Sequence, residues 1–285
     1  MNNNHIISVI GSGTMGNGIA HVFALSNKVS KVFLIDLDIK ILNKAKLIIK
    51  GNLDRQLQKK LISSSDAQNA FNKICCSTQI EDVAASNLII EAVKEDFDVK
   101  KNIFKKLDAL ATKDTILATN TSSISIDKIA NSINQRKNVI GMHFMNPVPV
   151  MKLVEIIKGS NTDALIVKKT LDYVSLLNKI AIECNDAPGF VSNRILMPMI
   201  NEAAFTLMEG VAEAEAIDGI MKLGMGHPMG PLKLADLIGI DVCVSIMKVL
   251  FEGFNSSKYK VCPLLVDMEN NNKLGVKTKE GFYKY

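Results

Sequence analysis

A histidine and a glutamate are the first side chains in this sequence that could move a proton together. His143 lies at the end of the apolar run VIGMHF, and Glu155 lies in the run VEIIKG. If the two runs fold back antiparallel about Pro149, these residues stand opposite each other, because both are equally far from Pro149; facing side chains of such strands can contact one another. A carboxylate orients an imidazole and favours its protonated form, so the pair could act as a general base. For this pair taken alone, a histidine with a purely structural hydrogen bond is the preferred interpretation, and the rest of the sequence shifts the preference to the general base.

A glycine motif near the amino terminus predicts a dinucleotide site. The apolar run IISVI leads into GSGTMG, and residues with helical spacing follow. In this setting the first glycine allows a tight turn, the second lets the backbone approach a pyrophosphate, and the third lets helix and strand pack closely. The helix N-terminus then faces the phosphates. The residues expected to bind the cofactor here are Gly11, Gly13, Thr14, Met15 and Gly16.

An acidic residue at the end of the second predicted strand indicates which dinucleotide binds. The run KVFLID ends at Asp36, about 20 residues after the last glycine of the motif, which is the spacing of an acid that binds the ribose hydroxyls. Leu37 and Asp38 follow, and no arginine is placed there to meet a 2′-phosphate. The sequence therefore favours NAD over NADP.

The composition narrows the class of protein. The chain has 285 residues, 47% hydrophobic and 22% charged, which indicates a globular protein long enough for two domains. The net charge of +5 comes from scattered lysines, which suits an anionic small ligand better than a nucleic acid. The five cysteines show no metal-ligand spacing, so neither disulfides nor a metal site is expected. Without a signal peptide or a membrane-length apolar run, we expect a cytoplasmic protein with no membrane partner.

Alternating apolar strands and helical patterns predict an α/β fold, a Rossmann-type doubly wound sheet followed by a smaller all-α domain. We place an NAD-binding domain at residues 1–185, with a helical arm at about 38–70, and the all-α domain at 186–285. The arm is expected to hold two helices broken near Gly51, and one later helix is expected to span 231–251. Because so small an all-α domain buries little surface by itself, we expect a homodimer formed through it.

Doubly wound sheets bind their ligands beyond the carboxyl ends of the strands. The residues predicted to fall at or just beyond those ends are Gly11, Ala92, Asn120, Ser122 and His143. Residues distant in sequence are thus expected to meet in one crevice. Ser122 and Ser123 could instead cap the following helix, and for Ser123 capping is the preferred interpretation.

Basic side chains recur with helical spacing along the predicted arm. They are Lys40, Lys44, Lys46, Lys50, Arg55, Lys59 and Lys60. For most of these residues taken one by one, the simpler interpretation is that they form the solvent-exposed face of a helix. An arm beside the cofactor crevice could also hold a phosphorylated part of the substrate.

Five runs of the sequence carry a resemblance to a known family. They are ATNTSS, GMHFMNPVPVMKLVEII, DAPGFVSNRI, KLGMGHPMGP and KTKEGFYKY, and they follow the amino-terminal GxGxxG. Together they resemble the L-3-hydroxyacyl-CoA dehydrogenase family, and most of all its short bacterial 3-hydroxybutyryl-CoA members. The resemblance extends over nearly the whole chain, in the family's order.

The resemblance implies roles for individual residues. His143 would be the catalytic base and Glu155 its partner, while Ser122 and Asn193 would hydrogen-bond the oxygen and thioester region of an acyl-CoA substrate. Glu95 and Lys100 would contact the nicotinamide-side ribose, and Asn120 would lie near the nicotinamide. The residues that complete the expected cofactor-binding set are Ala92, Ser122 and Asn146. The implied reaction is the reversible NAD-dependent oxidation of a 3-hydroxyacyl-CoA, in fatty acid or butanoate metabolism, by a homodimer.

Two other functions stay open on the residues alone. A related β-hydroxyacid dehydrogenase acting on a free acid would use a catalytic lysine, and the predicted His–Glu pair points away from it. A non-enzymatic NAD(H)-binding protein would need the glycine motif and Asp36 only. It would not need the four residues expected to carry the catalysis, which are Ser122, His143, Glu155 and Asn193.

Overall fold

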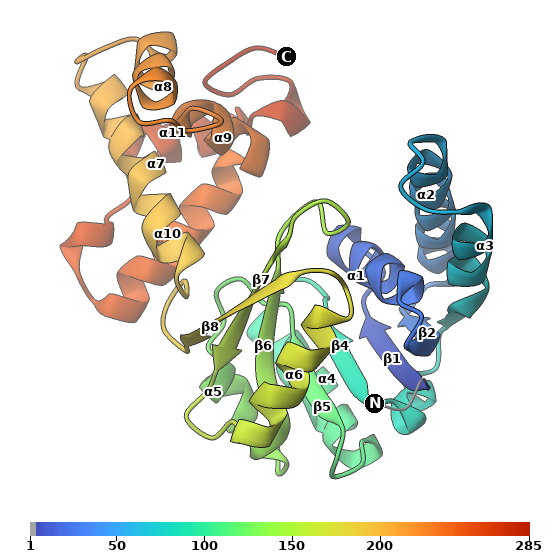
Figure 1. The fold of residues 1–285 in the computed structure, drawn as a ribbon. Coiled ribbons are helices and arrows are strands. Elements are labelled where there is room, and N and C mark those ends of the chain that lie inside the picture. Colours follow the sequence, from blue (N-terminus) through green and yellow to red (C-terminus); the bar gives the residue numbers. More distant parts are fainter. Residues whose placement is uncertain (1–3) are drawn as a thin grey trace. The chain divides into compact units, whose positions relative to one another are not determined.

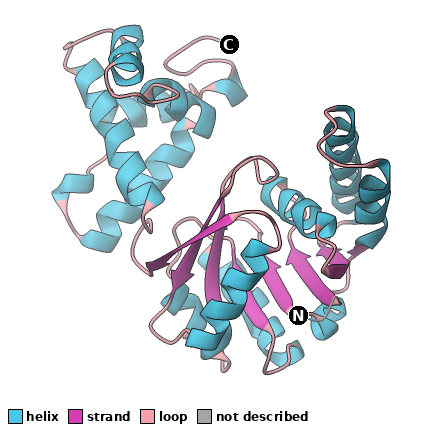
Figure 2. Ribbon diagram, in the orientation of Figure 1, coloured by secondary structure: helices cyan, strands magenta, loops and turns pink. Residues whose placement is uncertain are grey.

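The structure is a computed structural model that describes residues 4–285 and divides into two compact units (Figure 1). The first unit ends at Asp186, and the second covers Ala187–Tyr285. The division falls one residue after the domain boundary expected from the sequence. All the named strands belong to the first unit, as Figure 2 shows.

The first unit is built on one eight-stranded sheet with the order β3-β2-β1-β4-β5-β6-β7-β8. Its neighbouring strands are parallel except for the antiparallel pair β6 and β7. The order 3-2-1-4-5-6 is that of a dinucleotide-binding sheet, and the predicted fold class is confirmed. The strands are β1 (His5–Ile10), β2 (Val29–Ile35), β3 (Ile74–Ser77), β4 (Leu88–Glu91), β5 (Ile116–Thr119), β6 (Val139–Phe144), β7 (Leu153–Lys158) and β8 (Ile180–Asn185).

Helices cover both faces of this sheet because its strands are apolar on both sides. The helices α1 and α6 share one buried cluster with the sheet, which includes Phe23 and Val174. The helices α4 and α5 lie on the opposite face (Figure 1). The bounds are α1 (Thr14–Leu25), α4 (Phe97–Leu110), α5 (Ile126–Ala130) and α6 (Ala164–Ser175), with short 3₁₀ helices η1 (Ile80–Ala85) and η2 (Arg136–Asn138).

The helical arm consists of α2 (Ile39–Gln58) and α3 (Ser64–Lys73). The expected break near Gly51 is wrong, because α2 runs through it without interruption. One glycine costs a helix only about 1 kcal/mol, which packing of a continuous apolar stripe offsets. The helix ends instead before Lys60, whose φ of 55° turns the chain into the left-handed region. The buried stripe of α2 consists of Leu42, Ala45, Ile49 and Leu53.

The second unit is helical and has its own apolar core. One helix over 231–251 was expected, which is wrong: Gly239, with a φ of 108°, separates α9 from α10. None of the helices within residues 4–285 combines the length and apolar composition needed to span a bilayer. The elements are α7 (Ser192–Met208), α8 (Ala214–Leu223), α9 (Pro231–Ile238), α10 (Ile240–Phe254), α11 (Pro263–Asn270), η3 (Ser257–Tyr259) and η4 (Val276–Thr278).

Candidate active site

The glycine motif has the geometry of a phosphate-binding turn. Gly11 has a φ of +94°, and a Cβ there would lie 2.6 Å from the Ala92 carbonyl oxygen. At Gly16 a Cβ would lie 1.8 Å from the Gly11 oxygen, so neither position accepts a side chain. A Cβ on Gly13 would meet nothing within 4 Å, which leaves space beside the backbone at the start of α1. The first N–H groups of that helix can therefore receive the phosphates of a dinucleotide.

Asp36 lies next to this turn at the end of β2. Its Oδ2 accepts hydrogen bonds of 2.7 Å from the Ser12 N–H and from Ser12 Oγ, and its Oδ1 accepts one of 2.7 Å from the Leu37 N–H. These bonds hold the half-buried carboxylate against the glycine turn. The residues of the turn and Asp36 thus fit NAD, whose ribose hydroxyls would meet this acid.

The predicted pairing of His143 with Glu155 is confirmed by the register of β6 and β7. Nδ1 of His143 lies 2.7 Å from Oε2 of Glu155, and the two residues are 9% and 4% exposed. An ionised Glu155 requires Nδ1 to be the donor, so the neutral imidazole carries its lone pair on Nε2. The adjacent Phe144 N–H donates to Asn120 Oδ1 at 2.9 Å, which ties the end of β6 to the end of β5. The arrangement can accept a proton at Nε2 and stabilise the resulting imidazolium.

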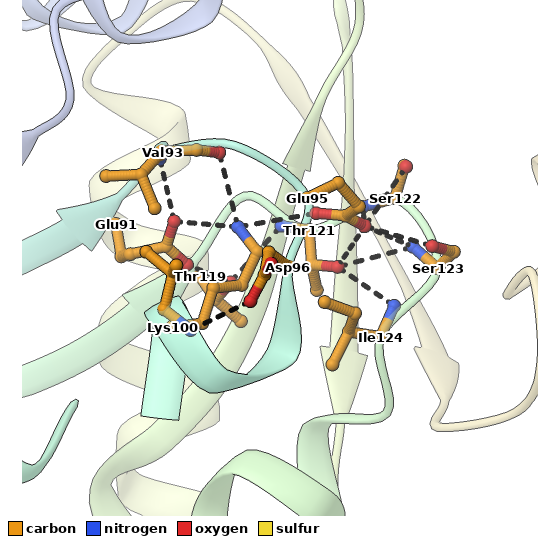
Figure 3. A network of polar contacts seen from close by, with 11 residues as sticks. Glu91, Val93, Glu95, Asp96, Lys100, Thr119, Thr121, Ser122, Ser123 and Ile124 are labelled. Atoms are coloured by element: carbon orange, nitrogen blue, oxygen red, sulfur yellow. Dashed lines mark hydrogen bonds and ion pairs between the residues drawn. The ribbon is translucent and has the colours of Figure 1, made fainter. Parts of the chain in front are cut away.

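The turn after β5, residues 120–125, is organised by the carboxylate of Glu95 (Figure 3). Its Oε1 accepts from the N–H groups of Ser122 and Ser123 at 2.9 and 3.0 Å, and from Thr121 Oγ1 at 2.5 Å. Burial raises the pKa of Glu95, but Lys100 and these hydrogen bonds together lower it below the ordinary value. Glu95 is therefore a carboxylate at neutral pH.

Ser123 does not cap the following helix, contrary to expectation. The N-cap of α5 is Ser125, whose Oγ accepts from the Lys128 N–H at 3.1 Å. Oγ of Ser123 donates to Glu95 at 3.0 Å instead. Ser125, with a φ of −56° and a ψ of 130°, has the non-helical backbone that an N-cap requires, whereas the hydroxyl of Ser123 is bonded to Glu95.

A buried ion pair that the sequence analysis missed lies beneath this turn. Lys100 Nζ is 2.7 Å from Glu91 Oε1, with side chains only 1% and 0% exposed. Glu91 also accepts from Thr119 Oγ1 and from the Val93 N–H, each at 2.7 Å. A signal for it was present, because a carboxylate at the end of the apolar strand NLIIE needs a cation or several donors when it is buried.

The remaining candidate residues are distributed over both units. Ala92 donates its N–H to the Ile10 oxygen at 2.7 Å and so joins the ends of β4 and β1. Asn146 is exposed in the loop after β6 and precedes Pro147 with a cis peptide bond. Asn193 is a buried residue of the first turn of α7 in the second unit.

Possible metal ligands and cysteines occur across the described residues. Within residues 4–285, no three or more His, Cys, Asp or Glu side chains are grouped so that they could hold a metal ion. The five cysteines are free thiols. Burial raises the pKa of Cys184 to about 11 and that of Cys243 to about 12, so these thiols are poor nucleophiles at neutral pH.

Comparison with known proteins agrees with this geometry. Residues 6–187 match the NAD binding domain of 3-hydroxyacyl-CoA dehydrogenase, and residues 189–285 match its C-terminal domain. The chain is 47% identical over 279 residues to 3-hydroxybutyryl-CoA dehydrogenase of Bradyrhizobium diazoefficiens, covering 98% of this chain and 94% of that one. It is 39% identical over 290 residues to human mitochondrial hydroxyacyl-coenzyme A dehydrogenase, covering 98% and 90%.

A solved structure is similar over the whole length. The crystal structure of (S)-3-hydroxybutyryl-CoA dehydrogenase from Ralstonia eutropha has a TM-score of 0.95 and 41% sequence identity, and the match covers 99% of each chain. The matched domains, the relatives and the glycine turn with its acid all point to one family. The chain therefore belongs to the 3-hydroxyacyl-CoA dehydrogenase family.

Proposed function

We propose that the protein catalyses the reversible NAD-dependent oxidation of an L-3-hydroxyacyl-CoA, with 3-hydroxybutyryl-CoA as the substrate, to the 3-ketoacyl-CoA. The observation that carries the proposal is the 2.7 Å contact between His143 and Glu155 at the carboxyl end of an NAD-binding sheet. A protein that only bound NAD would not need a buried imidazole held by a carboxylate at this edge of the sheet. Relatives named for this reaction support the choice of substrate.

In the oxidation, His143 accepts the proton of the substrate hydroxyl at Nε2. Glu155 keeps the ring in the required tautomer and stabilises the imidazolium that forms. When bound, NAD supplies the acceptor for the hydride that leaves C3 of the substrate. In the reverse direction the protonated His143 donates to the oxygen of the ketone, so the proton returns to the substrate.

Other residues position the two reactants in this proposal. Ser122, held in the turn after β5, and Asn193 of α7 hydrogen-bond the substrate oxygen and the thioester region. The residues proposed to hold the cofactor are Gly11, Gly13, Thr14, Met15, Gly16, Asp36, Ala92, Glu95, Lys100, Asn120, Ser122 and Asn146.

The arm is the proposed binding element for the phosphates of CoA. Its helix α2 presents basic side chains to solvent, and among residues 4–285 none of them takes part in an ion pair. Exposed Ile41 and Leu47 lie on the same helix and could contact the less polar part of the thioester. The exposed basic residues are Lys40, Lys44, Lys50 and Arg55 of α2, and Lys59 and Lys60, which directly follow it.

We also propose that the protein is a homodimer and acts in the cytoplasm, in fatty acid or butanoate metabolism. The second unit leaves large apolar side chains exposed on and beside α7 and α8, and a second copy could cover them. They include Ile195, Val211, Ile220 and Leu223. Sedimentation of the intact protein would test the dimer.

The test of the activity is NADH oxidation by the full chain with acetoacetyl-CoA, run beside free acetoacetate and beside NADPH. We expect rapid turnover of the thioester with NADH, and little with either of the other two combinations. Equal turnover of free acetoacetate would replace the proposal by a free-acid dehydrogenase. NADH binding without turnover of any 3-ketoacyl thioester would leave a binding protein.

A further inference from the structure

The loop between β6 and β7, residues 145–152, joins the strands that carry His143 and Glu155. Inside it the N–H of Met151 donates to the Pro147 oxygen at 3.0 Å, so the loop contains a turn of its own. Such a turn leaves other carbonyls of the loop without a partner, and they need donors from outside it when they are sheltered from water. The conformation of the loop therefore depends on a neighbouring segment.

Lys179 supplies donors for two of these carbonyls. Its Nζ donates to the Val148 oxygen at 2.6 Å and to the Met151 oxygen at 2.5 Å. Hydrogen bonds from a charged group are short and stronger than those between neutral groups. The N–H of the next residue, Ile180, donates to the Lys152 oxygen at 2.8 Å, so the backbone beside the lysine is tied to the end of the same loop. The side chain thus holds the loop from a fixed point.

The loop also packs against the helix of the cofactor site. Val148 is 2% exposed, and a Cβ on Gly18 of α1 would lie 2.9 Å from its Cβ. Pro149 and Lys179 line one cavity together with Val22 of α1, and Figure 1 shows the loop beside this helix. A displacement of the loop would therefore change its position relative to α1, whose N-terminus is proposed to receive the phosphates of the dinucleotide.

The two loop carbonyls also stabilise the charge of Lys179. Burial lowers the pKa of this half-buried lysine, and none of the ion pairs within residues 4–285 includes it. A charge that is sheltered from water is costly unless hydrogen bonds satisfy it. The loop and the lysine therefore fix each other in position.

We propose that Lys179 is a positioning residue, which holds the loop between β6 and β7 so that Asn146 meets the cofactor beside His143. Because Asn146 follows the base by three residues, the part of the cofactor that it meets is the nicotinamide, which accepts the hydride. Lys179 acts through the backbone of the loop. The inference deepens the proposed function and rests on it, because there Asn146 belongs to the cofactor site and His143 is the base.

The first test follows the loop itself and needs no activity. Amide hydrogen exchange is measured in the full-length protein for wild type, Lys179→Met and Lys73→Met. Methionine keeps most of the length of the lysine side chain and removes its donors. The N–H groups of Val150 and Met151, which both donate to the Pro147 oxygen, report on the loop. We expect their exchange to be roughly tenfold faster in Lys179→Met and unchanged in Lys73→Met.

Lys73 is the matched control because it binds two backbone carbonyls in the same way. Its Nζ donates to the Ala24 oxygen at 3.2 Å and to the Ser26 oxygen at 2.7 Å, at the carboxyl end of α1. It is half-buried as well, and burial lowers its pKa. Lys73 supports the end of a helix, whereas Lys179 supports the loop after His143. A contribution to stability alone would therefore affect both variants alike.

The second test separates the two ends of the cofactor. ADP carries the adenosine and the diphosphate of NADH but no nicotinamide, so its binding should not need Asn146. For Lys179→Met we expect the Kd of NADH to rise roughly tenfold, that of ADP to stay within about twofold of wild type, and kcat with acetoacetyl-CoA to fall roughly tenfold. Lys73→Met should match wild type in all three values. A loss of thermal stability alone, or equal weakening of ADP and NADH, would overturn the inference.

A further variant covers the case in which Lys179→Met does not fold. Lys179→Gln keeps a polar group in the half-buried position, but its side chain is too short to reach both carbonyls. Smaller changes in the same direction are expected, and wild-type exchange and NADH affinity would overturn the inference. If the wild-type protein fails to reduce acetoacetyl-CoA, the proposed function fails, and the exchange measurement still decides whether Lys179 holds the loop. If wild type is active and the variants match it, only this inference fails.

Discussion

Two buried pairs of a base and a carboxylate lie in the same sheet-based unit and differ in what they leave accessible. The contacts His143–Glu155 and Lys100–Glu91 have the same length of 2.7 Å. The side chains of the first pair are 11% and 6% exposed, and those of the second are 1% and 0% exposed. The first pair contains an imidazole, a group that can accept and donate a proton, whereas the second contains an ammonium group that donates to Glu91 and to the Val93 oxygen inside the protein.

This difference shows how the degree of burial distinguishes a residue that reacts with the substrate from one that stabilises the fold. A group that exchanges a proton with a substrate needs a titratable atom at the edge of the protein, with its other atoms held. A supporting group needs the opposite, a charge that is fixed and completely satisfied. Changes at His143 should therefore affect turnover first, and changes at Lys100 should affect stability first.

The largest expected effect is at the first pair. In His143→Gln the ring that accepts the proton is gone, so kcat with acetoacetyl-CoA should fall by roughly 10²–10⁴-fold, the usual share of a general base. NADH binding, followed by fluorescence titration, should be unchanged because the glycine turn and Asp36 are untouched. A variant that kept its kcat would show that His143 is not the base.

At the second pair the effect should be on stability. Lys100→Met leaves Glu91 buried without its counter-ion, which should lower the free energy of unfolding by about 3–5 kcal/mol in urea titrations. The control is Lys158→Met, which breaks a partly exposed 3.1 Å contact with Glu183 and should cost no more than about 1 kcal/mol. Equal losses for the two variants would remove the distinction between the pairs.

Asp36 offers an intermediate case, a half-buried carboxylate that should act on a ligand. Asp36→Asn keeps the shape of the side chain but loses the charge that binds the ribose hydroxyls. The KM for NADH should rise roughly tenfold, which corresponds to the loss of one charge-assisted hydrogen bond, and kcat should change little. An unchanged KM for NADH, or a fall in kcat alone, would show that Asp36 does not bind the cofactor.

The smallest effect concerns pH. The pKa of Glu95 is held below its ordinary value of 4.5 although burial raises it, because Lys100 and the hydrogen bonds of the turn prevail. A carboxyl group with a lowered pKa stabilises the folded state above its unfolded pKa, and this contribution is lost as the pH falls through the folded pKa. It should be below about 1 kcal/mol, since the side chain is 36% exposed.

The measurement for this last case is unfolding in urea between about pH 6 and about pH 3, because carboxyl groups titrate roughly in this range. Stability should decrease below about pH 4.5 more steeply in wild type than in Glu95→Gln. Parallel curves for the two proteins would mean that Glu95 does not contribute.

Local signals in the sequence were sufficient for much of the site. The glycine turn and Asp36 could be predicted because their chemistry depends on a short strand, a turn and a helix that follow one another directly. The pairing of His143 with Glu155 could be predicted because the two residues are equally far from Pro149 along two apolar runs, and the observed register of β6 and β7 is the one centred there.

Two glycines show where local signals end. Gly51 was expected to break a helix and Gly239 to lie inside one, yet α2 continues through the first and the chain turns at the second. Gly51 is surrounded by space, whereas a Cβ on Gly239 would approach Asp241 and Lys277 within 3.0 Å, at a φ of 108°. One of these neighbours, Lys277, comes from a distant segment, and a local sequence pattern does not contain such a contact.

The sequence by itself determined the sheet, the cofactor motif and the facing histidine and glutamate, since each follows from periodicity or from short-range spacing. Only the tertiary structure decided the buried contacts among Glu91, Lys100 and Glu95. A lysine near the start of a helix usually points to solvent, and although the apolar strand before Glu91 indicates that this carboxylate needs a cation, the sequence does not indicate that Lys100 supplies it. It does so because β4, β5 and α4 close around a buried carboxylate, and an unpaired charge there would be too costly to keep.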